Sequence, residues 1–121
     1  MKRILVIEDD ADVKDVICLY LEAKGYDVVS AANGEEAVDL YRDTPADLVI
    51  TDIIMPEKEG IETIEEFRRD FPEAQIIAIS GAGRGGAQDY LMVAEMLGAV
   101  RTFTKPFKME QLLEAVRQIV G

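Results

Sequence analysis

The sequence predicts an α/β fold, a single doubly wound (βα)5 domain over residues 1–121 with a five-stranded parallel sheet and helices on both faces. Two observations lead to this prediction. Short apolar runs alternate with amphipathic stretches five times along the chain, and no repeat or linker interrupts them. The composition, with 49% hydrophobic and 31% charged residues, is typical of a globular domain. Strict alternation favours parallel strands joined by right-handed crossovers.

The first third of the chain predicts a strand, a helix and a second strand. Ile4–Ile7 is a continuous apolar run, as expected for a strand buried on both faces. From Asp12 onward, apolar residues recur at intervals of three and four, which predicts a helix. The predicted buried side of this helix consists of Val13, Val16, Ile17, Tyr20 and Leu21. Gly25 is expected to end it in a left-handed conformation, and the less apolar stretch 26–30 predicts a strand nearer an edge.

The middle of the chain repeats this pattern. Asn33 is expected to cap a second helix, with Glu36 reaching back to the cap. The predicted buried side of that helix is Ala37, Val38 and Tyr41. Leu48–Asp52 then predicts a buried third strand that ends at a carboxylate. A third helix is predicted after Gly60 and ends before Pro72. Its predicted buried side is Ile61, Ile64, Phe67 and Phe71.

The last third predicts two more strands and two more helices. Residues 75–79 form a fourth apolar run that ends at Ser80-Gly81, and residues 81–88 carry four glycines and predict a loop. A short helix is predicted over 90–97, closed by Gly98. Residues 100–104 predict a fifth strand, which ends at Lys105-Pro106. The final helix has its predicted apolar side at Met109, Leu112, Leu113, Val116, Ile119 and Val120.

Composition excludes several classes of function. The chain contains no histidine, which rules out Ser-His-Asp triads, Cys-His pairs and histidine-bearing zinc sites, and this chain cannot itself be a phosphohistidine donor. Cys18 is the only cysteine, so no intrachain disulfide can form, as suits a reducing compartment. A formal net charge of −11 makes direct binding to nucleic acid unfavourable.

The sequence also gives no sign of export or of a membrane. No apolar run approaches the roughly 20 residues that a membrane span needs. The stretch before the first acidic residues is too short for a signal peptide. We therefore expect a cytoplasmic protein that does not contact a membrane.

Polar residues that end four of the predicted strands form the candidate site. Glu8 and Asp9 end the first strand, Asp52 the third, Ser80 the fourth and Lys105 the fifth. Ligands of open parallel sheets bind outside the carboxyl ends of the strands, so we expect these side chains to face one crevice. Each residue alone has a plainer explanation, such as a helix cap, a turn or a solvated loop. Their chemical complementarity as a set favours a single site.

The chemistry of this set points to phosphoryl transfer. Clustered carboxylates repel one another and need a cation, and magnesium fits because it binds few carboxylates and keeps several waters. A carboxylate nucleophile, here Asp52, can form an acyl phosphate. The metal, Lys105 and the Ser80 hydroxyl would supply the positioning and charge neutralisation that this reaction requires.

In this order and spacing, the motifs resemble those of the receiver domain of two-component response regulators, chemotaxis regulators among them. The likeness covers essentially the whole chain. Ile4–Asp9 is similar to the acidic-pair motif and Asp52–Pro56 to the phosphoacceptor motif. Ser80-Gly81 is similar to the Thr/Ser-Ala/Gly motif and Lys105-Pro106-Phe107 to the Lys-Pro motif. The resemblance implies the flavodoxin-like strand order 2-1-3-4-5 and a phosphorylatable signalling switch, which is not a conventional enzyme.

The resemblance also implies a role for each site residue. Asp52 would accept a phosphoryl group from a histidine kinase or histidine phosphotransfer protein, and the domain would signal to a downstream effector protein or domain. Asp9 would bind Mg²⁺ directly, Glu8 would bind it through water, and the backbone carbonyl of Ile54 would be a further ligand. Ser80 would hydrogen-bond the phosphoryl group and Lys105 would pair with it. The domain would catalyse its own phosphorylation and dephosphorylation.

Two features depart from the family pattern. The family often carries an aromatic switch residue three positions before the lysine, where this sequence has Thr102 with Phe103 beside it. The glycine-rich segment 81–88 is longer than in compact receivers, and we expect it to become ordered when Ser80 is engaged. The sequence is compatible with a stand-alone receiver and with a receiver cut from a longer regulator.

Three other functions stay open on the sequence alone. A magnesium-dependent phosphatase of the haloacid-dehalogenase type also uses an aspartyl phosphate, but it needs Asp-x-Asp after its first strand, and here the acids are contiguous. An interaction module that works without phosphorylation usually loses the acceptor, an acid or the lysine, all of which are present. An FMN carrier needs a hydroxyl- and glycine-rich loop after the first strand, and acids there would repel the FMN phosphate.

Overall fold

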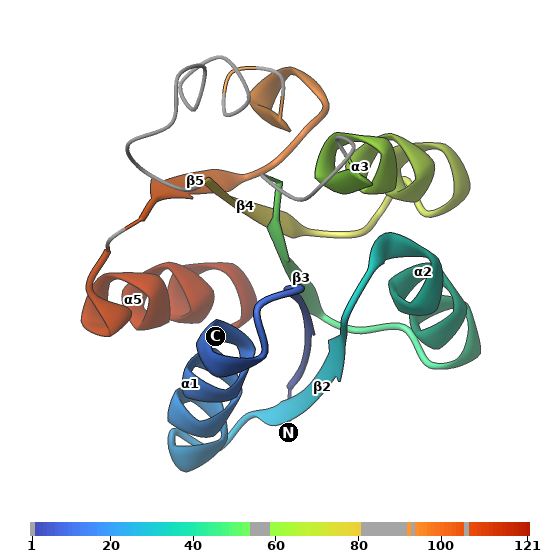
Figure 1. The fold of residues 1–121 in the computed structure, drawn as a ribbon. Helices are drawn as coiled ribbons and strands as arrows, with labels where there is room; N and C mark the ends of the chain where they lie inside the picture. The colour runs from blue at the N-terminus through green and yellow to red at the C-terminus, as the bar shows by residue number, and fades with distance from the viewer. Residues whose placement is uncertain (1, 54–58, 81–91, 93, 106) are drawn as a thin grey trace.

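The computed structural model describes residues 2–53, 59–80, 92, 94–105 and 107–121. These residues form one five-stranded sheet in the order β2-β1-β3-β4-β5, with every neighbouring pair parallel (Figure 1). The strands are β1 (Arg3–Ile7), β2 (Asp27–Ala31), β3 (Leu48–Asp52), β4 (Ile76–Ser80) and β5 (Arg101–Thr104). The helices are α1 (Ala11–Ala23), α2 (Gly34–Asp43), α3 (Glu59–Asp70) and α5 (Met109–Val120). The predicted doubly wound sheet and its strand order are confirmed.

Different helices cover the two faces of the sheet. Figure 1 shows α1 and α5 against one face and α2 and α3 against the other. Side chains alternate along each strand, so Leu5 and Ile7 join the layer under α2 and α3, while Ile4 and Val6 join the layer under α1 and α5. The central strands β3 and β4 are buried along their whole length, which explains their continuous apolar sequences.

The helix ends follow from local chemistry. Asp10 caps α1, because its Oδ1 accepts hydrogen bonds from the backbone N–H groups of Asp12 and Val13. Asn33 caps α2 as predicted, since its Oδ1 accepts from the backbone N–H of Glu36 at 2.9 Å. Gly25 follows α1 with a φ of 96°, the left-handed conformation expected of a glycine after a helix.

The structure corrects one predicted buried residue and the ends of several predicted strands. Val16 was predicted inside but is 57% exposed, because α1 buries a narrow stripe around Ile17 and Leu21. Strands β2 and β4 begin and end one residue later than predicted, and β5 begins one residue later. The glycine-rich segment 81–88 lies outside the described residues. Of the predicted helix over 90–97, residues 90, 91 and 93 also lie outside the described residues, whereas residues 92 and 94–96 are helical.

Two further observations concern the environment of Cys18 and the apolar character of the helices. Cys18 packs half-buried against the core layer under α1 and α5, and burial raises the pKa of its thiol. In the described part of the chain, no helix is long and apolar enough to cross a membrane.

Candidate functional site

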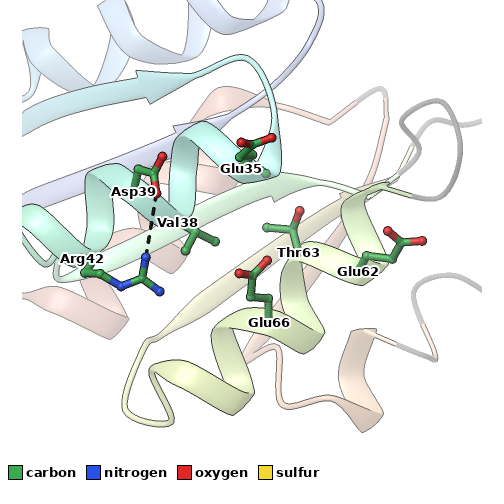
Figure 2. A pocket seen from close by; sticks show the side chains of 8 residues that line it. Glu35, Val38, Asp39, Arg42, Glu62, Thr63 and Glu66 are labelled. Carbon is green, nitrogen blue, oxygen red and sulfur yellow. Dashed lines mark ion pairs between the residues drawn. The ribbon is translucent and has the colours of Figure 1, made fainter.

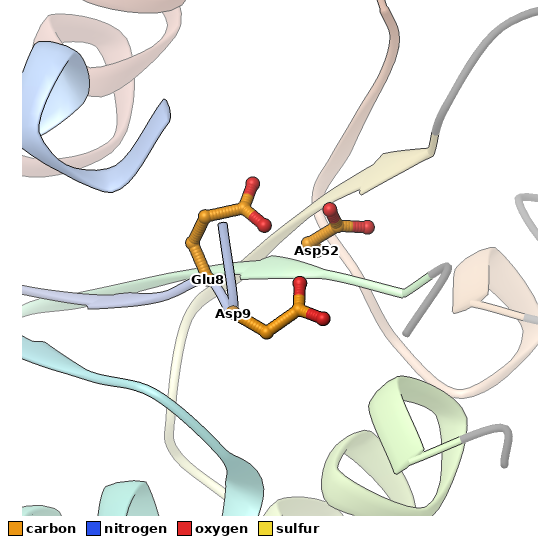
Figure 3. Close-up of side chains that lie close together, drawn as sticks. All are labelled: Glu8, Asp9 and Asp52. Carbon is orange, nitrogen blue, oxygen red and sulfur yellow. The ribbon is translucent and has the colours of Figure 1, made fainter. Parts of the chain in front are cut away.

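Three carboxylates meet where β1 and β3 end. Glu8 and Asp9 follow β1 directly, and Asp52 is the last residue of β3. The two strands are neighbours in the sheet, with Ile7 opposite Thr51, so their carboxyl ends lie side by side. One carboxylate oxygen from each of the three acids lies within 4.8 Å of the others (Figure 3). The structure thus brings together the three acids that the sequence singles out.

Lys105 carries a positive charge into this cluster from the end of β5. Its Nζ donates hydrogen bonds to Asp52 Oδ2 at 2.8 Å and to Glu8 Oε1 at 2.9 Å. Burial disfavours the charged ammonium, but its hydrogen bonds to Asp52 and Glu8 and their negative charges outweigh burial and raise the pKa of Lys105. The side chain is therefore a cation at neutral pH and partly offsets the repulsion among the acids.

Glu8 lies inside the protein, with 2% of its surface exposed. Burial raises its pKa to about 7, and the negative charge of Asp52 adds to this rise, although the hydrogen bond from Lys105 opposes it. A second hydrogen bond comes from the backbone N–H of Asp10 to Glu8 Oε2 at 3.2 Å. A cation beside this acid would favour its ionised form.

Ser80 ends β4, the strand between β3 and β5. The strand registers place Asp52 opposite Ile79 and Ser80 opposite Thr104, so Ser80 lies at the same sheet edge as the acids and Lys105. Its hydroxyl is buried and has no hydrogen-bond partner among the described residues. An unsatisfied buried hydroxyl costs about 1–3 kcal/mol. An oxygen-rich group bound at this edge could satisfy it.

The donor set fits a hard divalent cation. All three acids offer oxygen ligands, which Mg²⁺ and Ca²⁺ prefer, and Asp9 is exposed, so the cluster is open to solvent on its side. An open cluster lets a bound ion keep waters that phosphoryl oxygens can replace. Ile54, whose backbone carbonyl the sequence suggests as a further ligand, lies outside the described residues, so this role stays a prediction.

The residues near the usual switch position lie on opposite faces of β5. Thr102 is opposite Ala78, and alternation along β4 places Ala78 and Ser80 on the same face of the sheet. Phe103 is opposite Ile79 and belongs to the core layer under α1 and α5. Phe103 therefore cannot take the place of an aromatic residue on the face of Ser80.

Two contacts of the site were missed by sequence reasoning. The bond between Glu8 and Lys105 joins residues 97 positions apart. The specific hydrogen bonds by which Asp10 caps α1 were also not predicted, although an acidic residue at the start of this helix was considered. A signal for the first was present, because glutamate is one methylene longer than aspartate and can reach farther across the strand ends. A signal for the second was the run of helical periodicity that starts at Asp12.

A hollow lies away from this cluster, between α2 and α3 (Figure 2). It has a volume of about 340 Å³ and contains four acids with a single arginine, Arg42, which pairs with Asp39 at 3.8 Å. Its lining residues are Gly34, Glu35, Val38, Asp39, Arg42, Glu62, Thr63 and Glu66. None of them belongs to the cluster around Asp52, so this hollow is separate from the acids at the strand ends.

Comparison with known proteins identifies the class. The profile of the family described as the response regulator receiver domain matches residues 4–117. The chain therefore belongs to this family, the receiver domains of two-component signal transduction, which are not conventional enzymes.

Individual relatives show the same likeness over the whole chain. The chain is 36% identical over 120 residues to the chemotaxis protein CheY of Bacillus subtilis, and the match covers 98% of both proteins. It is 38% identical over 120 residues to the probable C4-dicarboxylate response regulator DctR of the same organism. This match covers 96% of this chain and 51% of DctR. The chain thus spans nearly all of CheY and about half the length of DctR.

Solved structures agree with the fold. The receiver domain of NtrX from Brucella abortus matches with a TM-score of 0.89 and 26% identity over 97% of both chains. A response regulator receiver domain from Clostridium thermocellum matches with a TM-score of 0.89 and 27% identity, over 99% of this chain and 94% of that one.

Proposed function

We propose that this receiver domain is a switch that accepts a phosphoryl group on Asp52 in a Mg²⁺-dependent reaction. The single observation that carries the proposal is the contact of Asp52 Oδ2 with Lys105 Nζ at 2.8 Å inside a cluster of three acids. The donor would be the phosphohistidine of a histidine kinase or of a histidine phosphotransfer protein. This chain has no histidine of its own, which is consistent with a donor on another protein.

In the proposed reaction, a carboxylate oxygen of Asp52 attacks phosphorus. The bond between phosphorus and the histidine nitrogen breaks as a bond between phosphorus and oxygen forms. The leaving imidazole keeps the electron pair of the broken bond and takes up a proton from solvent. Lys105 neutralises negative charge on the transferred group, and the Ser80 hydroxyl donates a hydrogen bond to one of its oxygens.

The acids would hold the metal in this reaction. Asp9 and Asp52 would bind it directly, with Glu8 through water and the carbonyl of Ile54 as a further ligand. When bound, Mg²⁺ supplies charge neutralisation for the phosphoryl oxygens. Because Asp52 is 5% exposed and Glu8 is 2% exposed, little bulk water competes with these contacts.

The phosphorylated domain would then signal to another protein or to an attached effector. Relatives such as the transcriptional regulatory protein CpxR of Escherichia coli, of which the match covers 50%, support the second arrangement for part of the family. Relatives such as CheY, matched over nearly their full length, support the first.

Intact-mass spectrometry after incubation with acetyl phosphate tests the proposal, with and without Mg²⁺. We expect an adduct of one phosphoryl group that requires Mg²⁺, is labile to base, and is absent in the Asp52→Asn variant. Asp47→Asn, an exposed aspartate whose carboxylate accepts from the backbone N–H of Arg3, is the matched control and should still form the adduct. An adduct that persists in Asp52→Asn would contradict the assignment of the acceptor.

A further inference from the structure

Glu8 uses both of its carboxylate oxygens for contacts within the chain. Oε1 accepts a hydrogen bond from Lys105 Nζ at 2.9 Å, and Oε2 accepts one from the backbone N–H of Asp10 at 3.2 Å. The first contact reaches the segment after β5, and the second reaches the residue before α1. Glu8 therefore joins two segments that are far apart in the sequence.

Asp10 continues this connection into α1. Its Oδ1 accepts hydrogen bonds from the backbone N–H groups of Asp12 at 3.0 Å and Val13 at 3.3 Å. A continuous series of hydrogen bonds and backbone thus leads from Lys105 through Glu8 and Asp10 to the first turn of α1.

The same two segments form the walls of an apolar groove of about 420 Å³. One wall is the first half of α1, and the other is the segment from Lys105 into α5. The groove is lined by Asp12, Val13, Val16, Ile17, Lys105, Phe107 and Met109. Lys105 both lines this groove and contacts Asp52. A change in the hydrogen-bond partner of Lys105 therefore affects both the groove and the acidic cluster around Asp52.

We infer that Glu8 is a positioning residue that couples the partner of Lys105 to the placement of α1 across this groove. The inference rests on the proposed function for its cause. In the unmodified protein, Asp52 and Glu8 hold Lys105 together. Once Asp52 carries a phosphoryl group, Lys105 pairs with phosphoryl oxygens, and its hydrogen bond to Glu8 lengthens or breaks. Glu8 then shifts against the backbone of Asp10, and the first turn of α1 follows.

The length of the side chain at position 8 is the critical property. Aspartate is one methylene shorter, so we expect it to lose the contact to Lys105, although an aspartate can still accept from the backbone N–H two residues on, as Asp10 does from Asp12. The Glu8→Asp variant keeps the carboxylate and breaks the connection. Lys105→Met breaks it from the other end while keeping the apolar stem that lines the groove.

The test is NMR spectroscopy of the full chain without Mg²⁺, in the parent, Glu8→Asp, Lys105→Met and the double variant. Both single variants should shift the amide signal of Asp10 and the methyl signals of Val13 and Val16. In the double variant these shifts should not add, because both changes break one connection.

The matched control is Glu36→Asp, the same shortening at an exposed position of α2, which should leave the Val13 and Val16 signals unchanged. Additive shifts, or shifts confined to the neighbours of each substituted residue, would overturn the inference. If Glu8→Asp does not fold, Lys105→Met alone decides through the amide signal of Asp10, which does not line the groove with Lys105, because an unshifted Asp10 signal would exclude the coupling.

A second measurement separates the inference from the proposed function. The parent is treated with acetyl phosphate and Mg²⁺, and the mass and the methyl spectrum are recorded on the same sample. An adduct with shifted Val13 and Val16 signals supports both statements. An adduct with those signals unchanged overturns the inference and leaves the proposed function standing. A parent without an adduct contradicts the proposed function, and its variants still decide whether Glu8 links Lys105 to α1.

Discussion

At the scale of single residues, we expect the Ser80 hydroxyl to have opposite effects on the stability of the domain and on its phosphorylation. Its buried hydroxyl lacks a partner among the described residues, so the Ser80→Ala variant should lose no stability and can gain up to about 1 kcal/mol. The same variant should form the phosphoryl adduct more slowly, because a donor to the phosphoryl group is missing. Urea denaturation and the rate of adduct formation check the two halves.

Thr51 provides the contrast for this prediction. Its hydroxyl is also buried but donates to the backbone carbonyl of Asp52 at 3.2 Å. Thr51→Val keeps the shape and removes that bond, so it should cost about 1 kcal/mol. A Ser80→Ala variant that loses as much as Thr51→Val would show that Ser80 has a partner in the unmodified protein.

Glu8 should make stability depend on pH in magnesium-free buffer. Its pKa is about 7 in the folded protein against 4.5 as the ordinary value, so the folded state holds the proton more tightly. The contribution of Glu8 to folding is therefore fully present below about pH 4.5 and is lost as the pH rises to about 7. This shift corresponds to about 3 kcal/mol between the two limits.

The Glu8→Gln variant isolates this term, because glutamine cannot ionise. The stability of the parent relative to Glu8→Gln should fall between pH 4.5 and pH 7, as measured by urea denaturation in EDTA. Glu36→Gln, an exposed glutamate, serves as the control and should show a flat difference. A flat difference for Glu8→Gln as well would show that Glu8 ionises normally.

The site also shows where sequence reasoning ends at this scale. Strand-end position places Glu8, Asp52 and Lys105 at one edge of the sheet, because carboxyl ends of parallel strands meet there. Which carboxylate oxygens accept hydrogen bonds from the Lys105 ammonium depends on side-chain length and on the exact register of β1, β3 and β5. Those quantities are set by packing of the whole sheet, so the contact of Lys105 with Glu8 became visible only in three dimensions.

At the scale of elements, the contact between α2 and α3 depends on a glycine. A Cβ added at Gly34 would lie 1.9 Å from Thr63 Oγ1 and 3.1 Å from Thr63 Cβ. Gly34→Ala should therefore lower the free energy of unfolding by about 1–3 kcal/mol, although alanine favours helix by itself. Thermal and urea denaturation measure this loss.

The rescue of this variant is specific. Thr63→Ala removes the oxygen that an alanine at position 34 would meet, so the double variant should recover most of the loss relative to Thr63→Ala alone. A Gly34→Ala variant as stable as the parent would mean that α2 and α3 separate without cost.

The periodicity of the sequence predicted whether each element is a helix or a strand. It was less accurate for the buried face of a helix and for the residues at which an element begins and ends. The runs at Leu48–Asp52 and at residues 75–79 predicted buried central strands, because strands covered on both faces are apolar throughout. The exposure of Val16 was missed, since α1 packs through Ile17 and Leu21 and lies beside an open groove. An apolar residue beside a groove keeps the period of a core residue, and periodicity cannot distinguish the two.

At the scale of the whole molecule, the acids at the strand ends should link metal binding to folding. An ion that binds only the folded state raises the free energy of unfolding, by about 2.7 kcal/mol at one hundred times its dissociation constant. We expect Mg²⁺ to raise the melting temperature of the parent, as measured by circular dichroism. The net charge of −11 also responds to salt, so ionic strength must be matched with NaCl.

Asp9→Asn should remove most of the Mg²⁺ effect, because it takes one carboxylate from the cluster. Asp39→Asn removes one charge from the acidic hollow between α2 and α3 and should keep the effect. Equal responses to Mg²⁺ in these two variants would indicate that the ion screens overall charge and does not bind at the strand ends.

The distance along the chain between Glu8 and Lys105 has a consequence for biosynthesis. A ribosome produces the acids of β1 and β3 well before it produces Lys105, which lies 97 residues after Glu8. During that interval the nascent chain carries Asp52, the proposed acceptor, without its ammonium partner and without a complete sheet. If the proposed donor protein requires Lys105 beside Asp52, we expect it to leave unfinished chains unmodified, so that only chains synthesised through β5 become substrates.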